Sequence, residues 1–226
     1  MPPRRLLLAG ASGLIGRSAL ALLAERPTPG PAWALLRRPA DKRLAEALLR
    51  AQAQAMVVPD LLALPRLPPV DDVFIALGTT IQVAGSEAAF RQVDLDAVRA
   101  VASAARAAGA TRLAVVSALG ASTHSTVFYN RVKGEMEEAV SALGFDSLTI
   151  ARPSLLAGDR AALGQPVRLG ERWALRLTRP LQALIPASVR PIEARRVALA
   201  LLRALASGAP GRVILDSAAL ARQGAD

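Results

Sequence analysis

A glycine-rich loop near the amino terminus restricts the fold of this chain more than any other feature. Three glycines, Gly10, Gly13 and Gly16, recur at every third position. They follow a short apolar run, Arg4–Ala9, and open a helical pattern, Leu14–Glu25. Glycines in this context allow a tight turn and a close approach of the backbone to a phosphate, and the helix N-terminus adds amide groups. The loop predicts a dinucleotide site, although glycines that merely close a strand–helix turn would look similar.

Short apolar runs alternate with longer helical patterns through the first two thirds of the chain. We expect strands over residues 4–9, 31–36, 55–58, 72–77, 113–117 and 147–151, and helices over residues 14–25, 41–53, 87–108 and 127–143. This alternation predicts a parallel, doubly wound sheet with helices on both faces, which is the three-layer α/β/α arrangement of a Rossmann-type fold.

The pattern is looser after Pro153. There we expect a helix over residues 172–184, an amphipathic helix over 193–206 and a final strand over 212–215. Because no linker or internal repeat is visible, we interpret residues 1–226 as a single domain. Residues 157–206 are expected to form a small C-terminal cap on the substrate side of that domain.

The composition excludes several other classes of protein. An apolar content of 52% with 20% charged residues indicates a folded chain. The absence of cysteine excludes disulfides, and a single histidine, His124, makes us expect no metal site. The apolar run after Arg5 stops at Gly10, which indicates a first strand instead of a signal peptide. No uninterrupted apolar stretch reaches the length of a membrane span, so we expect a cytoplasmic protein that does not cross a membrane.

The net charge of +10 raises the question of nucleic-acid binding. Against it, the basic residues are scattered in runs no longer than two, and an aromatic content of 3% leaves few side chains for stacking on bases. The partner that we expect is a small carbonyl substrate. A homodimer formed through the helices at 87–108 and 127–143 is left open.

Two arginines indicate which dinucleotide the site prefers. NAD sites usually carry an acidic residue about twenty positions after the glycines, where it binds the ribose 2′-hydroxyl. Here the end of the second predicted strand reads Arg37-Arg38 with no acid. Guanidinium groups suit a 2′-phosphate, and Arg17 could add to them. The sequence therefore favours NADP(H), although Arg37 and Arg38 could also be ordinary surface residues.

Tyr129 and Lys133 are the residues that most directly suggest a reaction. Tyr129 is the only tyrosine, and Lys133 is one of two lysines. Their spacing puts both on one face of the predicted helix at 127–143. The positive charge of Lys133 would favour the tyrosinate, so that Tyr129 could act as a general acid toward a carbonyl. Ser117, directly after the fifth predicted strand, could bond the same oxygen, although Ser122, Thr123 and Ser125 are nearby rivals.

Taken together, these motifs resemble the atypical short-chain dehydrogenases/reductases, and most closely their Tat-interacting-protein-like subgroup. The segments that carry the resemblance are Gly10–Gly16, Leu77–Thr80, Ser117–Ala121, Tyr129–Glu135 and Arg152–Leu156. The resemblance covers residues 4–160 well and the remainder loosely.

The resemblance implies a Ser117/Tyr129/Lys133 catalytic triad with NADP(H) as cofactor, and Lys133 would also hold the nicotinamide ribose. The cofactor-binding residues that we expect are Gly10, Ser12, Gly13, Leu14, Ile15, Arg37, Arg38, Leu77, Gly78, Thr79, Lys133 and Pro153.

The chain departs from the family pattern at two points. The asparagine that completes the tetrad in classical members has no clear counterpart, and the cap is shorter than in nucleotide-sugar epimerases. Two functions stay open. The first is an NADPH-dependent reductase of a small carbonyl compound, and the second is a non-catalytic NADP(H)-binding regulator or assembly factor.

Overall fold

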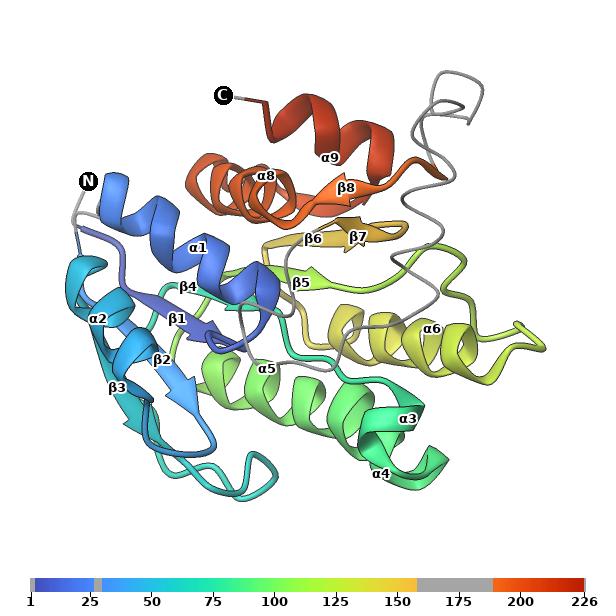
Figure 1. Cartoon of the computed structure of the whole chain (residues 1–226), viewed down its shortest axis with the longest axis horizontal. Helices are drawn as coiled ribbons and strands as arrows, with labels where there is room; N and C mark the ends of the chain where they lie inside the picture. Colours follow the sequence, from blue (N-terminus) through green and yellow to red (C-terminus); the bar gives the residue numbers. More distant parts are fainter. Residues whose placement is uncertain (1–2, 27–29, 158–188, 226) are drawn as a thin grey trace.

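The computed structural model describes residues 3–26, 30–157 and 189–225, which form a sheet with helices on both faces (Figure 1). Seven parallel strands lie in the order β3-β2-β1-β4-β5-β6-β9. Their bounds are β1 Leu6–Ala9, β2 Ala32–Leu36, β3 Ala53–Val57, β4 Asp72–Ile75, β5 Arg112–Val116, β6 Ser147–Arg152 and β9 Gly211–Asp216. The chain winds from β1 outward to β3 and then, in the opposite direction, from β4 to β9.

Successive residues of each strand enter two hydrophobic cores, one on each face of the sheet. In β1, Leu8 lies in the first core and Leu7 in the second, and in β4 Phe74 lies in the first and Ile75 in the second. Side chains alternate between faces along a strand, so a strand that is covered on both faces needs consecutive apolar residues. This requirement explains the short continuous apolar runs of the sequence.

Helices cover each core. The first core lies under α1 (Leu14–Glu25), α2 (Lys42–Arg50), α8 (Ala194–Ser207) and α9 (Ser217–Gln223). The second lies under α4 (Glu87–Arg91), the π-helix η1 (Gln92–Ala97), α5 (Val98–Ala107) and α6 (Phe128–Ser141). Figure 1 shows α1, α8 and α9 on one side of the sheet and α5 and α6 on the other. The remaining described elements are α3 (Ile81–Ala84) and a small parallel pair, β7 (Leu156–Ala157) and β8 (Ile192–Glu193).

The Rossmann-type, doubly wound fold predicted from the sequence is confirmed. The helix expected over residues 87–108 has about the expected extent, but its middle part, Gln92–Ala97, is a π-helix. A π-turn inserts an extra residue and so changes which side chains face the neighbouring elements; such turns are frequent at functional sites.

The C-terminal part of the chain differs from the expected cap. α8 packs against α1 and the sheet, and Val197, Leu201 and Leu205 are buried in the first core. The apolar stripe that identified this helix in the sequence therefore covers the sheet, so residues 194–206 belong to the Rossmann core and not to a cap. Residues 158–188, which include the helix expected over 172–184, lie outside the described residues.

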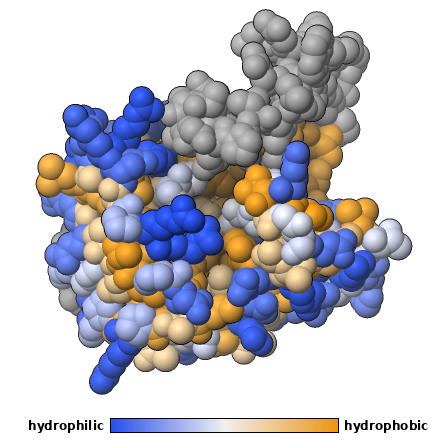
Figure 2. Space-filling model, turned by 60° about the horizontal axis from the view of Figure 1, so that its bottom comes forward, coloured by the Kyte–Doolittle hydropathy of each residue, from blue (hydrophilic) through white to orange (hydrophobic). Residues whose placement is uncertain are grey.

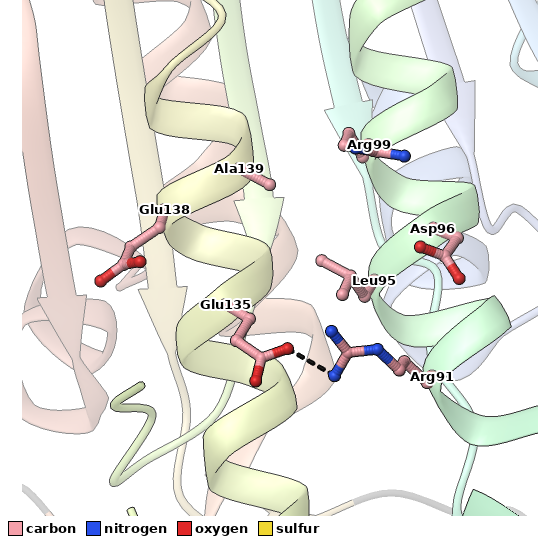
Figure 3. A pocket seen from close by; sticks show the side chains of 7 residues that line it. All are labelled: Arg91, Leu95, Asp96, Arg99, Glu135, Glu138 and Ala139. Carbon is pink, nitrogen blue, oxygen red and sulfur yellow. Dashed lines mark ion pairs between the residues drawn. The ribbon is translucent and has the colours of Figure 1, made fainter. Parts of the chain in front are cut away.

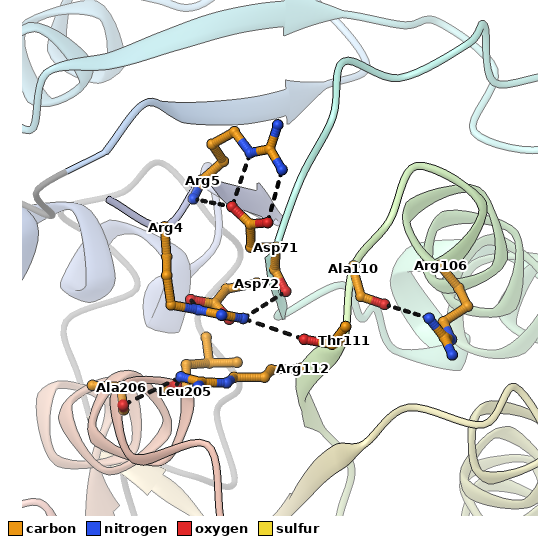
Figure 4. A network of polar contacts seen from close by, with 10 residues as sticks. All are labelled: Arg4, Arg5, Asp71, Asp72, Arg106, Ala110, Thr111, Arg112, Leu205 and Ala206. Carbon is orange, nitrogen blue, oxygen red and sulfur yellow. Dashed lines mark hydrogen bonds and ion pairs between the residues drawn. The ribbon is translucent and has the colours of Figure 1, made fainter. Parts of the chain in front are cut away.

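Polar contacts join neighbouring elements at the amino ends of the strands (Figure 4). Arg4 forms an ion pair with Asp72 at 2.6 Å. The guanidinium of Arg5 donates two hydrogen bonds of 2.8 Å to the carboxylate of Asp71. Arg112 at the start of β5 donates to a backbone carbonyl in the last turn of α8 at 2.8 Å. These contacts tie β1 to β4 and β5 to α8, at the edge of the sheet opposite the predicted site, so their role is structural.

The face shown in Figure 2 mixes hydrophilic residues with smaller hydrophobic patches, and no single apolar surface covers it. Scattered exposed apolar residues of this kind are normal for a folded protein. Within the described residues, no helix combines the length and apolar character that crossing a bilayer requires.

Because of the Arg5–Asp71 ion pair, we expect the stability of the folded protein to decrease at acid pH. The hydrogen bonds from Arg5 are the main cause that lowers the pKa of Asp71 to about 2. The unfolded-state pKa is about 3.9, so the contribution of Asp71 is complete above about pH 4 and is lost as the pH falls toward 2. We expect Asp71→Asn to lower the free energy of unfolding at neutral pH by about 1 kcal/mol.

Urea unfolding at several pH values checks this expectation. The difference between the parent chain and Asp71→Asn should shrink below about pH 4. Glu46→Gln, which removes an exposed carboxylate without a partner in the described residues, is the matched control and should unfold like the parent chain. A destabilisation by Asp71→Asn that stays constant down to pH 2 would contradict the ion-pair explanation.

Candidate functional site

The predicted site residues gather at the edge of the sheet where the strands have their carboxyl ends. Gly10 follows β1, Leu77 lies just past β4, Ser117 follows β5 and Pro153 follows β6. These four strands are consecutive neighbours in the sheet. The winding reverses between β1 and β4, and open α/β sheets bind ligands in the crevice at such a point. The fold therefore brings the four segments together where a ligand would bind.

Gly10 allows the loop after β1 to touch the loop after β4. Its φ is +91°, a conformation that side chains other than glycine rarely adopt. A Cβ atom at Gly10 would overlap the carbonyl group of Ala76, and a Cβ at Gly16 would overlap the carbonyl of Gly10. The N–H of Gly13 donates to the carbonyl of Gly10 at 3.0 Å. Packing and turn geometry together therefore require glycine at Gly10, and packing alone requires it at Gly16.

The first turn of α1 is open to a ligand. Gly13 is the N-cap residue, and within the described residues no side-chain hydrogen bond caps this end of the helix. Ser12 is exposed and Leu14 is half-buried, whereas the side chain of Ile15 lies in the first core, so only its amide could serve a ligand. The first amides of a helix have no acceptor within the helix. This helix terminus can therefore bind a phosphate group.

Two exposed arginines stand at the end of β2. Neither Arg37 nor Arg38 forms an ion pair with another described residue. Arg17, in contrast, donates to the carbonyl of Ser12 at 3.2 Å and forms an ion pair with Asp41 at 3.3 Å. Arg17 thus holds the glycine loop near the start of α2, while the guanidinium groups of Arg37 and Arg38 are available to an anion.

Ser117 extends the ladder between β5 and β6. Its N–H donates to the carbonyl of Ala151 at 2.7 Å, and the N–H of Leu119 donates to the carbonyl of Pro153 at 3.0 Å. The side chain of Ser117 is buried, and its hydroxyl oxygen has no hydrogen-bond partner within the part of the chain that the structure describes. Burying a hydroxyl without a partner is unfavourable. The group is therefore suited to a ligand oxygen.

The loop between β5 and α6 packs directly on the helix that carries Tyr129 and Lys133. A Cβ atom at Gly134 would overlap backbone atoms of Ser122 and Thr123. The absence of a side chain at Gly134 thus lets the loop that begins at Ser117 approach α6 beside Lys133.

Tyr129 and Lys133 lie one turn apart in α6, as predicted. The half-buried ring of Tyr129 packs against Phe90, with 5.3 Å between ring centroids. Lys133 is only 3% exposed, and its ammonium forms an ion pair of 2.7 Å with Asp94. Burial lowers the pKa of Lys133, but the negative charge of Asp94, helped by Tyr129 and Glu137, outweighs burial and raises the pKa above its ordinary value. Lys133 therefore carries a positive charge beside Tyr129.

Asp94 is a site residue that could not be recognised from the sequence motifs. It is fully buried in η1, where Oδ1 contacts Lys133 and Oδ2 accepts a hydrogen bond of 2.8 Å from the N–H of Thr79. It thus joins the loop after β4 to α6. The available signal was a carboxylate between the apolar residues Val93 and Leu95, because a buried charge requires a partner.

The arrangement offers two kinds of chemistry. The open first turn of α1, with Arg37 and Arg38, can bind the phosphates of a nucleotide. Gly78 and Thr79 are part of the neighbouring loop after β4. Ser117 and Tyr129 offer hydroxyl groups near the same edge of the sheet. The binding and catalytic roles of these residues stay predictions. Among the described residues, no group of three or more histidine, aspartate or glutamate side chains is placed to hold a metal ion.

A separate surface depression lies between the helical path of η1 and α5 and the neighbouring α6 (Figure 3). The side chains that line it are Arg91, Leu95, Asp96, Arg99, Glu135, Glu138 and Ala139. An ion pair between Arg91 and Glu135 crosses it. None of the predicted site residues lines this depression, which distinguishes it from the candidate site.

Curated proteins of fungi are similar to this chain. It is 36% identical to "Protein fmp52, mitochondrial" of Emericella nidulans over 158 residues, which are 68% of this chain and 67% of that protein. It is 35% identical to "Protein FMP52, mitochondrial" of Eremothecium gossypii over the same shares of the two chains.

These relatives contradict the expectation of a cytoplasmic protein, because their names place them in mitochondria. The cytoplasmic expectation rested on the absence of cysteine and of a signal peptide for secretion. Neither feature separates the cytoplasm from the mitochondrion, so the expectation was wrong.

Solved structures share the fold at low sequence identity. The structure of MoeE5 in complex with UDP-glucose and NAD has a TM-score of 0.69 at 17% identity, covering 93% of this chain and 75% of that one. An oxidoreductase of the short-chain dehydrogenase/reductase family from Burkholderia thailandensis has a TM-score of 0.63 at 16% identity, with coverages of 98% and 94%. The sequence itself matches a family described as NAD(P)H-binding over residues 10–173, from the glycine loop past Pro153. This chain therefore belongs to the NAD(P)H-binding family of Rossmann-fold proteins.

Proposed function

We propose that this protein is an NADPH-dependent oxidoreductase of the atypical short-chain dehydrogenase/reductase type that reduces a small carbonyl compound. The observation that carries the proposal is the buried hydroxyl of Ser117, which has no partner in the described residues and lies at the end of a strand beside the predicted crevice. A nucleotide-binding scaffold alone has no need of such a group, whereas a substrate oxygen would satisfy it. The Tat-interacting-protein-like subgroup, which the sequence resembles most, is the subgroup that we propose.

The proposed reaction divides its tasks among three side chains. When bound, NADPH supplies two electrons to the carbonyl carbon as a hydride. Tyr129 donates the proton that the carbonyl oxygen needs, and Ser117 donates a hydrogen bond to the same oxygen and so polarises the carbonyl. The buried ammonium of Lys133 favours loss of the phenolic proton, because it stabilises the negative charge that Tyr129 acquires.

The preference for NADPH over NADH is proposed from the end of β2. Arg37 and Arg38 are exposed and without ion-pair partners in the described residues, so a 2′-phosphate could bind them without displacing an existing contact. No acidic residue stands there to accept a hydrogen bond from the ribose of NADH.

Replacing the first of these arginines tests the cofactor preference. We expect Arg37→Ala to weaken NADPH binding by about 10- to 100-fold, because charge-assisted hydrogen bonds to the 2′-phosphate are lost. NADH binding should change little. Fluorescence titration of both nucleotides measures the effect, and Arg50→Ala, which removes another exposed arginine on α2, is the matched control. Equal losses in both variants would mean that general positive charge, and not a 2′-phosphate site, attracts NADPH.

Replacing the phenol tests the reaction. NADPH oxidation is followed with a panel of aldehydes, ketones and quinones, and the best substrate is used for the variants. We expect Tyr129→Phe to lower kcat by about 10²- to 10⁴-fold, since general acid catalysis contributes on this scale, while NADPH binding is retained. His124→Ala, in the exposed loop before α6, is the control and should keep its activity.

Two outcomes would overturn the reductase proposal. One is a Tyr129→Phe variant as active as the parent chain. The other is a protein that binds NADPH tightly but turns over no member of the panel, which would favour an NADP(H)-binding regulator instead.

A further inference from the structure

Asp94 is a buried charge that lies between the loop after β4 and the helix that carries Tyr129 and Lys133. It is 0% exposed, and its carboxylate contacts the ammonium of Lys133 at 2.7 Å and the N–H of Thr79 at 2.8 Å. Removing a carboxylate from water is costly, and pairing it with a buried ammonium often only compensates for that cost. A structural ion pair alone therefore explains its presence poorly, and its position beside Tyr129 suggests a different role.

Asp94 lies in the continuous helical segment formed by α4, η1 and α5, and the contacts between this segment and α6 recur at the same residue spacing on both sides. Phe90 and Asp94 are four residues apart, as are Tyr129 and Lys133. Phe90 packs on the ring of Tyr129, and Asp94 pairs with Lys133. One turn of the α4–η1 segment thus contacts both Tyr129 and Lys133, the predicted catalytic residues of α6.

A third contact fixes the same register at the surface. Arg91, next to Phe90, forms an ion pair with Glu135, which lies two residues after Lys133, and Figure 3 shows this pair crossing between the two helical paths. Three contacts along two helices hold the spacing between them. The carboxylate of Asp94 is therefore held in place beside the ammonium of Lys133.

The other charged or titratable groups around the pair either have partners of their own or lie farther out, toward the surface. On α6, the buried Glu137 binds Arg152 at 2.6 Å and Arg212 at 3.5 Å, from β6 and β9. On the facing path, Arg91 is paired with Glu135 and Asp96 lines the surface depression. In the loop after β4, the backbone N–H of Thr79 faces the pair. The loop after β5 contains the Ser117 hydroxyl and, farther out, the exposed His124. Among the described residues, Asp94 is thus the acidic group in direct contact with the ammonium of Lys133.

From this geometry we infer that Asp94 is a positioning residue that sets the pH at which Tyr129 loses its proton. It holds the ammonium of Lys133 in place and offsets part of its positive charge. With Asp94 ionised, the pair is neutral overall and the phenol keeps its proton to higher pH than it would beside an unpaired ammonium. The inference rests on the proposed role of Tyr129 as general acid, but it can be tested without any turnover.

The composition of the chain makes the test direct. Tyr129 is the only tyrosine, so the near-ultraviolet absorbance of tyrosinate reports this one side chain. We expect the midpoint of this titration to move to lower pH by about one unit or more in Asp94→Asn, because the ammonium is then uncompensated in a site that water screens poorly. The substitution keeps the size of the side chain and its ability to accept a hydrogen bond from the N–H of Thr79.

Asp96→Asn is the matched control. It removes the same charge two residues along the same helix, where the half-buried Asp96 lines the solvent-filled surface depression, and should leave the midpoint within a few tenths of a unit because water and salt screen charges there far more than at Asp94. In Asp94→Asn/Lys133→Gln the ammonium is removed as well, and the midpoint should rise again relative to Asp94→Asn. Should Asp94→Asn alone not fold, the same substitution is compared in the Lys133→Gln background, where loss of the negative charge again lowers the midpoint.

An Asp94→Asn midpoint equal to that of the parent chain, or higher, would overturn the inference and leave Asp94 with a structural role only. The reductase proposal is judged separately. If it holds, the upper pH limit of carbonyl reduction moves down in Asp94→Asn together with the titration midpoint. If the protein shows no turnover while the midpoint still moves, the reductase proposal fails and the assignment of Asp94 to the ionisation of Tyr129 stands.

Discussion

The loops after β1 and β4 meet at a point where no side chain fits between them. Gly10 adopts a φ of +91°, and a Cβ atom there would overlap the carbonyl group of Ala76. This contact lies between the two strands at which the winding of the sheet reverses. It fixes the start of α1 beside the loop that carries Gly78 and Thr79. The open helix terminus and the remaining site residues are placed relative to one another by this backbone contact.

A second constraint acts deeper in the same site. The buried pair of Asp94 and Lys133 links η1 to α6, and the other carboxylate oxygen of Asp94 accepts a hydrogen bond from the N–H of Thr79. A buried ion pair of this kind is weak as a source of stability and can serve instead to specify one arrangement of its surroundings. In this protein the arrangement includes the single tyrosine, whose ring rests on Phe90 one turn earlier. Besides helping to cover the second core, η1 and α6 thus also position the residues with which we propose that the reaction is performed.

Much of this architecture could be predicted from local patterns in the sequence. Short apolar runs between helical patterns gave the strand positions to within a few residues, because a strand covered on both faces must be apolar throughout. The glycine spacing predicted the loop, since packing excludes any side chain at Gly10 and Gly16. Tyr129 and Lys133 were placed on one helix face because a spacing of four residues has that consequence in any α-helix.

The features that were missed depend on contacts between distant parts of the chain. The π-helix at Gln92–Ala97 has no local signature, and the pairing of Asp94 with Lys133 joins two separate elements. The amphipathic pattern at 193–206 correctly indicated a helix but not its location, since an apolar stripe does not reveal whether it faces a cap or the sheet. The prediction of a cytoplasmic location was wrong for a further reason. Composition indicates the redox conditions that a chain tolerates, but it does not identify the compartment in which the protein resides.

The most direct test of the central claim is a crystal structure of this chain grown with saturating NADP⁺. We expect the pyrophosphate on the first-turn amides of α1, the 2′-phosphate at Arg37 and Arg38, and the nicotinamide end of the cofactor beside Ser117, Tyr129 and Lys133. A nucleotide bound in the depression between Arg91 and Glu135, or a site at the carboxyl edge that stays empty under these conditions, would contradict it.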